Sequence, residues 1–390
     1  LRAVPRLEEE ASGEPTEVDW SRLFEHAGLD FAEFSPAVPA RLPPSYADQR
    51  CAWEGLHVDS DTQIRVEAAS YRGRPVLFQL VCPDWTKPER AVRSPPLLPV
   101  LFLVLLVAGA VLGRRNLRLG RADRKGAVRV ALFFAAIGAL SWLFGASHVP
   151  DLIELELLFS AIPYACTAAV VCWLVYLALE PYVRRLWPES LISWGRVLAG
   201  RFHDPLVGRD LLIGAAVGAC LPVLNFLVYL VAEWLGVPEV LRPQVGLDVL
   251  LGGRHLAAGF LTAVEVAVML GLFMLLLLVL VRFLLRNQWL AGAVVVLLSA
   301  LALPIDSYVL AIVVAVHSVI RVIVLIRYGL LATVAAFFSF IVLYFSPITS
   351  DIGAWYWQSS LLCLAVVAAV GAYGFYTSLG GRTSPSRSSI

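Results

Sequence analysis

Long apolar runs separated by short polar segments dominate the chain from Pro95 onward. A bilayer core about 30 Å thick needs about 20 helical residues, and most of these runs reach that length, the first being marginal. The pattern therefore predicts a mainly α fold: a polytopic helical membrane bundle over residues 96–380 with about nine transmembrane helices. The expected spans cover residues 97–113, 128–146, 152–179, 211–235, 257–281, 287–304, 306–326, 328–347 and 359–378.

Ahead of this bundle the pattern changes to short runs that predict a small α+β soluble module over residues 19–95, with a polar linker over 1–18. A short helix is expected from Asp19 to Ala27, since Asp19 suits the N-cap and Gly28 ends the apolar face.

Strands of the module are expected over residues 49–58, 63–71 and 75–82, and Arg72-Gly73-Arg74 suits a hairpin turn. With fewer than about 80 residues, the module is expected to depend on neighbouring protein, the membrane or a partner. The last residues, 381–390, form a polar tail that we expect to be flexible.

Composition agrees with a membrane protein. Hydrophobic residues make up 59% of the 390-residue chain and charged residues 16%, whereas soluble domains contain about 45–50% apolar residues. The acidic residues concentrate before residue 96 and the basic residues after it. An acidic soluble part on a basic membrane part argues against nucleic acid as a partner.

Arginine and lysine fall almost entirely on alternate loops. After the first span, one side of the expected bundle carries eighteen of these residues, and the other side carries only Arg242 and Arg254. Cytoplasmic loops are enriched in Lys and Arg. We therefore expect a multi-pass protein of the bacterial cytoplasmic (inner) membrane, with the N-terminal module extracytoplasmic and the C-terminus cytoplasmic.

The segment 180–210 on the basic side is the most distinctive. It combines tryptophans, arginines and acidic residues around a helical middle, which suits the headgroup layer of a membrane. Interfacial anchoring is one interpretation, and a docking surface for a cytoplasmic domain is the other. The candidate interface residues are Glu180, Arg184, Arg185, Trp187, Trp194, Arg196, Arg201, Asp204, Arg209 and Asp210.

Four polar residues lie inside the expected spans: Asn225, Glu265, His317 and Arg321. A carboxylate in the bilayer costs about 2.5–3.5 kcal/mol on insertion scales, so Glu265 should face the bundle interior or be protonated. His317 and Arg321 are i, i+4 neighbours, and Arg321 can reach toward the basic side. The alternatives are structural roles, or ion coupling in a transporter that uses Glu265 and His317.

The remaining motifs are few. Cys51 and Cys82 lie in the soluble module, where a disulfide and two free thiols are equally open. No spacing of Cys and His indicates a metal site, and no catalytic motif is present, so no catalytic residue, metal or cofactor is expected in this chain. The chain begins at Leu1 and has no signal segment in its first 30 residues, so we expect it to be a fragment.

The string LALEPYVRRLWPESLISWGRVLAGRFHDPLVGRDLLIG, residues 177–214, resembles the C-terminal membrane region of a type of bacterial serine/threonine protein kinase. Residues 114–129, 148–158, 250–255, 354–362 and 371–382 are similar to it as well. Residues 27–55 and 64–81 look like the extracytoplasmic segment of those proteins.

The resemblance implies that the chain is the non-catalytic C-terminal part of a receptor-type kinase, acting as membrane anchor and sensory or signal-transmission region. A cytoplasmic kinase domain, with its ATP and Mg, would lie upstream of Leu1. The expected partners are the lipid bilayer, that kinase domain in cis and, left open, a second copy of the chain in a homo-oligomer.

Overall fold

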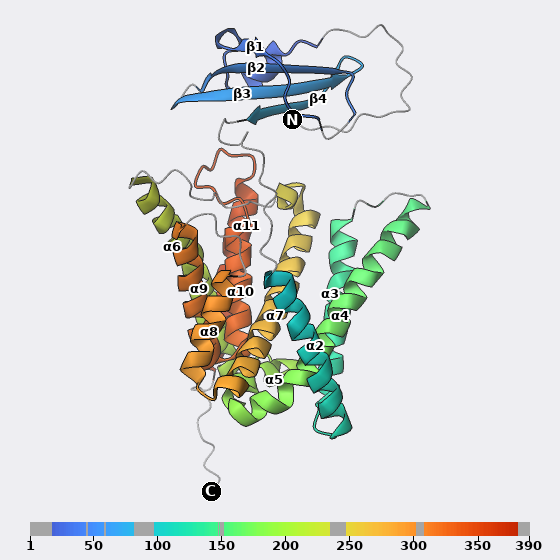
Figure 1. The fold of residues 1–390 in the computed structure, drawn as a ribbon, viewed down its shortest axis with the longest axis vertical. Helices are drawn as coiled ribbons and strands as arrows, with labels where there is room; N and C mark the ends of the chain where they lie inside the picture. Colours follow the sequence, from blue (N-terminus) through green and yellow to red (C-terminus); the bar gives the residue numbers. More distant parts are fainter. Residues whose placement is uncertain are drawn as a thin grey trace. The chain divides into compact units, whose positions relative to one another are not determined.

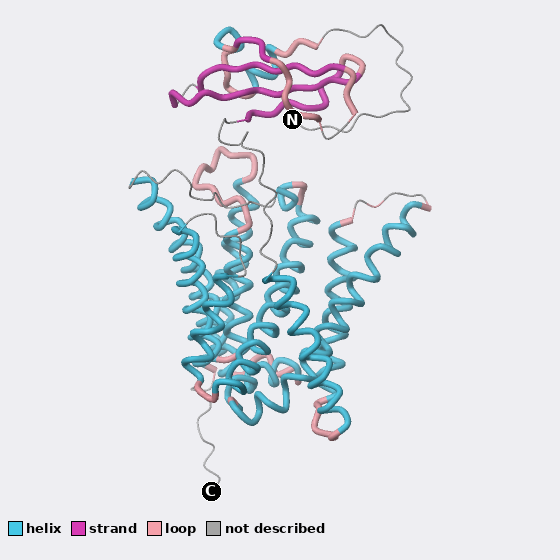
Figure 2. The backbone as a smooth tube through the Cα atoms, in the orientation of Figure 1, coloured by secondary structure: helices cyan, strands magenta, loops and turns pink. Residues whose placement is uncertain are grey.

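The computed structural model describes residues 18–43, 46–57, 60–81, 97–146, 148, 152–234, 247–301 and 308–380. Residue contacts divide the chain into two compact units, Leu1–Arg93 and Ser94–Ile390. The first unit is a small α+β module and the second is almost wholly helical (Figure 2). The predicted linker before Val18 and the tail over 381–390 lie outside the described residues.

The first unit is a four-stranded antiparallel sheet in the order β1-β2-β3-β4, accompanied by one short helix and one 3-10 turn. The expected helix is confirmed as α1, and Gly28 follows it with φ of +71°, but its N-cap residue is Trp20, without a side-chain cap, rather than Asp19. The expected hairpin turn is also confirmed, with Arg72 and Gly73 both at positive φ. The elements are α1 (Ser21–His26), η1 (Phe31–Glu33), β1 (Ser35–Ala37), β2 (Gln49–His57), β3 (Ser60–Tyr71) and β4 (Arg74–Val81).

Strand β1 was not expected, because the prolines around it favour an irregular extended segment. It pairs with β2 over only three residues, at the edge of the sheet, where proline is tolerated. A register shift between Ala69 and Ser70 disturbs the β3–β4 pairing. Val76 consequently packs with Ala69 in a separate cluster, rather than with Phe78 as simple alternation predicts.

Phe24 of α1 is the centre of the module's core. Its ring is fully buried and meets Phe31, Phe34, Trp53 and Phe78 edge to face, with centroids 4.9 to 5.4 Å apart. Aromatic pairs in this geometry contribute beyond their buried area. One ring therefore joins the helix, the 3-10 turn and two strands.

The second unit contains ten helices among the described residues, and most run in a common direction while α5 lies across one end (Figure 1). The helices are α2 (Leu97–Arg118), α3 (Arg124–Gly145), α4 (Ile153–Leu186), α5 (Ile192–Leu198), α6 (Pro205–Trp234), α7 (Gly253–Leu285), α8 (Gln288–Leu301), α9 (Tyr308–Tyr328), α10 (Leu330–Tyr344) and α11 (Trp357–Leu379). Two 3-10 helices, η3 (Pro188–Leu191) and η4 (Leu247–Leu250), precede α5 and α7.

Seven of these helices are long and apolar enough to cross a membrane: α2, α3, α4, α6, α7, α9 and α11. The expected fold class, a mainly α multi-pass membrane bundle, is therefore supported, but nine spans are not confirmed. Helix α8 has 14 residues and α10 has 15, which at 1.5 Å per residue is about 21–23 Å, short of a 30 Å core.

Two helices also extend further than their apolar runs. Helix α4 continues through Pro181 to Leu186, and α6 begins at Pro205 rather than near 211. Apolarity marks the thickness of the bilayer, whereas a helix can continue into the polar layer until a capping signal ends it. Part of the expected interfacial segment is therefore helix.

Helix α7 is the central helix of the bundle. It contacts α3 and α4 on one side and α8 and α10 on the other (Figure 1). Helices α2, α3 and α4 pack together, as do α6, α10 and α11. Two groups of helices thus meet along α7, whose share of buried residues is the largest among the seven long helices.

Small residues let α6 and α10 approach closely. A Cβ atom added to Gly214 would meet the Ala332 carbonyl oxygen at 2.4 Å, and one added to Gly218 would meet that of Ala336 at 2.4 Å. The two glycines are four residues apart, the spacing that places small residues on one helix face in membrane helix pairs. Backbone contact thus holds this half of the bundle.

We expect Phe24→Ala to destabilise the first unit by about 3–5 kcal/mol, because it removes a fully buried ring. Phe31→Ala is the matched control, since Phe31 is 39% exposed, and it should cause a clearly smaller loss. Pulse proteolysis of the purified chain across a urea series measures both. Equal losses would show that Phe24 is not the centre of this core.

We expect Gly218→Ala to lower the melting temperature of the purified chain in detergent, because the added methyl group meets the α10 backbone. In Gly371→Ala the methyl group meets nothing within 4 Å. That control should be neutral or stabilising by up to about 1 kcal/mol, since alanine favours helix over glycine. A stable Gly218→Ala protein would refute the close approach.

Candidate functional site

The arginine-rich segments of the second unit meet at one end of the bundle, here called the basic end: residues 114–129, 180–210, 282–288 and 327–330. Several contacts bring these segments together. The guanidinium of Arg282 lies 3.9 Å from the centre of the Trp187 ring. The backbone at Gly329 lies against that of Ser190, where a Cβ atom would meet the Ser190 carbonyl oxygen at 2.4 Å.

The segment 187–204, here called the crossing segment, is shaped by local signals. Helix α4 ends at Trp187 because Pro188 follows, and Pro188 then opens η3. Helix α5 ends before Gly200, which has φ of +78°, a conformation that glycine adopts without strain. Asp204 caps α6 by accepting a 3.0 Å hydrogen bond from the Leu206 amide.

Helix α5 is buried on one face. Trp194 is only 6% exposed, and the neighbouring Ser193 hydroxyl donates a hydrogen bond to the Asp210 carboxylate on α6. Asp210 is 1% exposed and also accepts a 2.9 Å hydrogen bond from the Arg209 side chain. Asp210 therefore joins α5 to α6.

An ion pair between Arg196 and Asp204 closes the loop between α5 and α6. Burial would raise the pKa of the Asp204 carboxyl, but the hydrogen bonds from Leu206 and Arg196 outweigh it, and the pKa is lowered. Asp204 is thus ionised and paired at neutral pH.

The crossing segment contacts helices from both groups of the bundle. Arg129 of α3 donates a 3.0 Å hydrogen bond to the carbonyl oxygen of Leu198. Tyr373 of α11 donates one of 3.0 Å to that of Phe202. Contacts with α4, α6, α9 and α10 complete the set. A shift of either helix group would therefore move this segment.

The structure divides the ten candidate interface residues into two sets. Trp194 and Asp210 are buried, and Trp187 stacks on Arg282, so these side chains hold the segment in place. Glu180 is buried as well and pairs with Arg184, and Arg196 pairs with Asp204. The exposed members are Arg184, Arg185, Arg201 and Arg209. These four arginines form the surface that a partner or a lipid headgroup can reach.

A cavity of about 530 Å³ lies at this surface, between the start of α3, the end of α4 and α5. Two carboxylates, Asp123 and Glu180, and four arginines, Arg129, Arg184, Arg196 and Arg201, line it. Tyr176 and apolar residues complete the lining. The excess of arginine makes the cavity attractive to anionic groups.

Of the four intramembrane candidates, only His317 and Arg321 share surroundings: they lie one turn apart on α9, and both contact the ring of Phe340. His317 is 5% exposed, and its ring packs edge-on to Phe340 of α10. Glu265 of α7 is 3% exposed. Among the described residues no hydrogen bond, ion pair or ring contact joins His317 and Glu265.

Arg321 and Asn225 each keep a buried polar atom without a hydrogen-bond partner among the described residues, Nε of Arg321 and Oδ1 of Asn225. The Arg321 guanidinium lies 4.7 Å from the Phe337 ring centre and 4.6 Å from that of Phe340. The sequence predicts that this long side chain reaches toward the basic side. Its guanidinium packs between aromatic rings instead.

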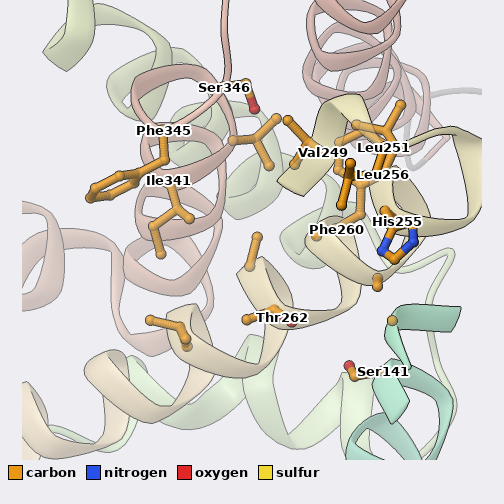
Figure 3. A pocket seen from close by; sticks show the side chains of 16 residues that line it. Ser141, Val249, Leu251, His255, Leu256, Phe260, Thr262, Ile341, Phe345 and Ser346 are labelled. Carbon is orange, nitrogen blue, oxygen red and sulfur yellow. The ribbon is translucent and has the colours of Figure 1, made fainter. Parts of the chain in front are cut away.

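A second cavity, of about 550 Å³, lies at the opposite end of the bundle. Figure 3 shows its walls: Ser141 comes from α3, His255 and Thr262 from α7, Ile341 from α10, and Phe345 directly follows α10. The lining is mainly apolar with a few polar groups, as in small-molecule sites. The Ser141 hydroxyl is buried without a hydrogen-bond partner among the described residues.

The Cys51–Cys82 pairing lies outside what the structure describes, because Cys82 is not among the described residues. Among those residues, no group of three or more His, Cys, Asp or Glu side chains is placed to hold a metal ion.

Comparison with known proteins adds no relationship. The chain matches no family model, no curated protein and no solved structure.

Several contacts that shape the basic end were not expected from the sequence. Asn116 of α2 donates hydrogen bonds of 3.0 and 3.2 Å to the carbonyl oxygens of Leu177 and Ala178 on α4. Asp123 caps α3 through the Gly126 amide at 2.9 Å. The Asp123 cap has a readable signal, an acidic residue just before an apolar run. The Asn116 hydrogen bonds join residues 61 and 62 positions apart in the chain, and no local sequence pattern predicts them.

We expect Asp204→Asn to keep the cap of α6 but to lose the ion pair with Arg196. The pair is partly exposed, so the loss at pH 7 should stay below about 1 kcal/mol. Because the folded-state pKa is lowered, the wild-type advantage is present above about pH 3.9. It disappears as the pH falls through the lowered value.

Thermal unfolding of the purified chain in detergent at pH 7, 5 and 3 measures this difference. Arg196→Gln removes the same pair from the other side and should show the same pH dependence. A difference between wild type and Asp204→Asn that does not shrink between pH 5 and pH 3 would contradict the assignment.

Proposed function

We propose that this chain is the membrane anchor and signal-transmission region of a receptor-type bacterial serine/threonine protein kinase, with the kinase domain upstream of Leu1. The resemblance of residues 177–214 to the membrane region of such kinases motivates the proposal. That string contains the end of α4, the whole crossing segment and the start of α6. The likeness thus falls on the part of the bundle with the densest polar contacts.

The observation that carries the proposal is the position of the crossing segment. It contacts α3, α4, α6, α9 and α10, and two exposed arginines accompany it, Arg185 at the end of α4 and Arg201 within the segment. A signal must favour one of two packings of the bundle to be transmitted. A segment that contacts both helix groups and exposes charges can report such a difference to a domain docked on it.

The proposed orientation places the basic end in the cytoplasm, where arginine-rich loops concentrate. It places the N-terminal module and the second cavity toward the extracytoplasmic side of the bacterial inner membrane. Helices α7 and α9 both end in basic residues, Arg282 and Arg327. For both ends to lie on the same side, α8 must return the chain across the membrane. Helix α11 also ends at the basic end, where Tyr373 bonds to Phe202, so α10 must cross as well, giving nine crossings with two short ones.

A transporter is the second candidate, and the buried carboxylate of Glu265 is the observation that favours it. The separate surroundings of Glu265 and His317 weaken the version in which these two residues work together. A Glu265→Gln variant with unchanged flux in every assay would count against this candidate.

The proposal predicts that the coding sequence upstream of Leu1 carries a glycine-rich loop and the HRD and DFG motifs of a kinase. In the full-length protein in proteoliposomes, reversing the exposed charges with Arg185→Glu plus Arg201→Glu should change autophosphorylation. The change should be about fivefold or more, the lower range of coupling between sites.

Arg254→Glu is the matched control, because Arg254 is an exposed arginine at the end of the bundle opposite the basic end. The autophosphorylation rate of this variant should equal that of the wild type. Absence of the kinase motifs upstream would reject the parentage. Equal rates for the double variant and the wild type would reject transmission through the crossing segment.

A further inference from the structure

A third cavity, of about 340 Å³, lies within the bundle between α2, α7, α8, α9 and α10. Its walls are almost entirely apolar, with Leu101, Phe102, Met269, Phe273 and Leu277 among them. The polar groups that line it are the Ser299 and Ser318 hydroxyls and the Arg321 guanidinium. The cavity is separate from the surface cavity at the basic end and shares no lining residue with it.

Arg321 is the unusual member of this lining. Among the described residues it forms no ion pair, and its buried Nε has no hydrogen-bond partner. Rings of Phe337 and Phe340 lie against the guanidinium. Aromatic rings occupy the faces of a planar cation, whereas its N–H donors point outward from the edge. The Nε–H donor of Arg321 therefore lacks a hydrogen-bond acceptor among the described residues.

An unpaired cation at this depth is costly. Arg321 lies seven residues before the end of α9, which is about 10 Å along the helix from the basic end. Cations in the bilayer normally pair with a counter-ion or line a cavity. The carboxylate of Glu265 does not serve, because Glu265 does not line this cavity and, among the described residues, forms no ion pair with Arg321. A carboxylate supplied by a ligand would pair with the guanidinium in a fork geometry.

We infer that this cavity binds a single-chain anionic amphiphile, a fatty-acid-like molecule whose carboxylate pairs with Arg321. Its hydrocarbon chain lies along the apolar walls formed by α2 and α7. This inference does not depend on the proposed function.

The size and direction of the cavity favour one chain. A volume of about 340 Å³ is near the lower limit of small-molecule sites, which suits one hydrocarbon chain better than the two of a phospholipid. Arg321 lies in the half of α9 nearer the basic end. Leu101 and Phe102 line the cavity from α2, where the Phe102 ring stacks on that of Phe273 of α7 with centroids 5.2 Å apart. A chain anchored at Arg321 of α9 would therefore extend across α7 toward α2.

Equilibrium binding of radiolabelled palmitate to the purified chain in detergent tests the inference. Palmitate should bind at one molecule per chain. Hexadecanol, which has the same chain without the charge, should bind about tenfold more weakly or worse, as expected when a buried charged donor loses its acceptor. Phosphatidylglycerol should compete poorly. Equal binding of palmitate and hexadecanol, or displacement of palmitate by phosphatidylglycerol at equal concentration, would overturn the inference.

Arg321→Gln should weaken palmitate binding by about tenfold or more and leave hexadecanol binding unchanged. Arg282→Gln is the matched control, because Arg282 also has a buried unpartnered nitrogen but does not line this cavity. It should bind palmitate as the wild type does.

Ser299→Phe keeps Arg321 and fills the cavity, so it should abolish binding. This variant decides the matter if Arg321→Gln does not fold. Wild-type binding in Ser299→Phe would show that palmitate binds elsewhere.

Discussion

Hydrocarbon provides no hydrogen-bonding partners for a polypeptide, so each polar group that enters it must be satisfied by the protein itself. From Leu97 onward this constraint accounts for the helices, because a helix satisfies its own backbone. It also accounts for the division of polar side chains. They gather at the ends of the bundle, and the few in its interior are the positions where a role beyond packing is most easily argued.

At the basic end, polar groups are used as structural ties. Asn116 bonds to backbone carbonyls of α4, Asp210 joins α5 to α6, and Arg282 stacks on Trp187. These contacts keep the crossing segment in register with several helices. A segment held in this way gains little from being merely an anchor, because a few tryptophans at the interface would suffice for that. Its dense attachment is better explained if the position of each helix matters to what the segment presents.

Inside the bundle the balance is different. Arg321, His317 and Asn225 each keep a buried polar atom without a partner among the described residues. Such atoms cost stability, and the apolar cavity beside Arg321 provides room for a group that would satisfy one of them. The proposed ligand site and the proposed transmission path thus occupy different parts of the same bundle. Helix α7 contributes to both halves of it.

The sequence alone determined the class of the protein and, apart from the 3-10 turn and the edge strand β1, the elements of its soluble module. The length of each apolar run reports the thickness of the solvent that surrounds it, and a hairpin turn is specified by its own two residues, as at Arg72 and Gly73. Only the tertiary structure decided which charged side chains join helices and loops and which are exposed. Arg184 and Arg196 look alike in the sequence, but one is 67% exposed and the other closes a loop with Asp204.

The same limit applies within the membrane. Glu265 and His317 are both polar residues at depth, and nothing local shows that they face different neighbours. The partner of a side chain is set by the rotation and packing of whole helices, so it depends on contacts between residues far apart in the chain. The lengths and positions of the apolar runs do not specify that rotation. For this reason the sequence determined that helices form and only the packed bundle decided what their polar residues meet.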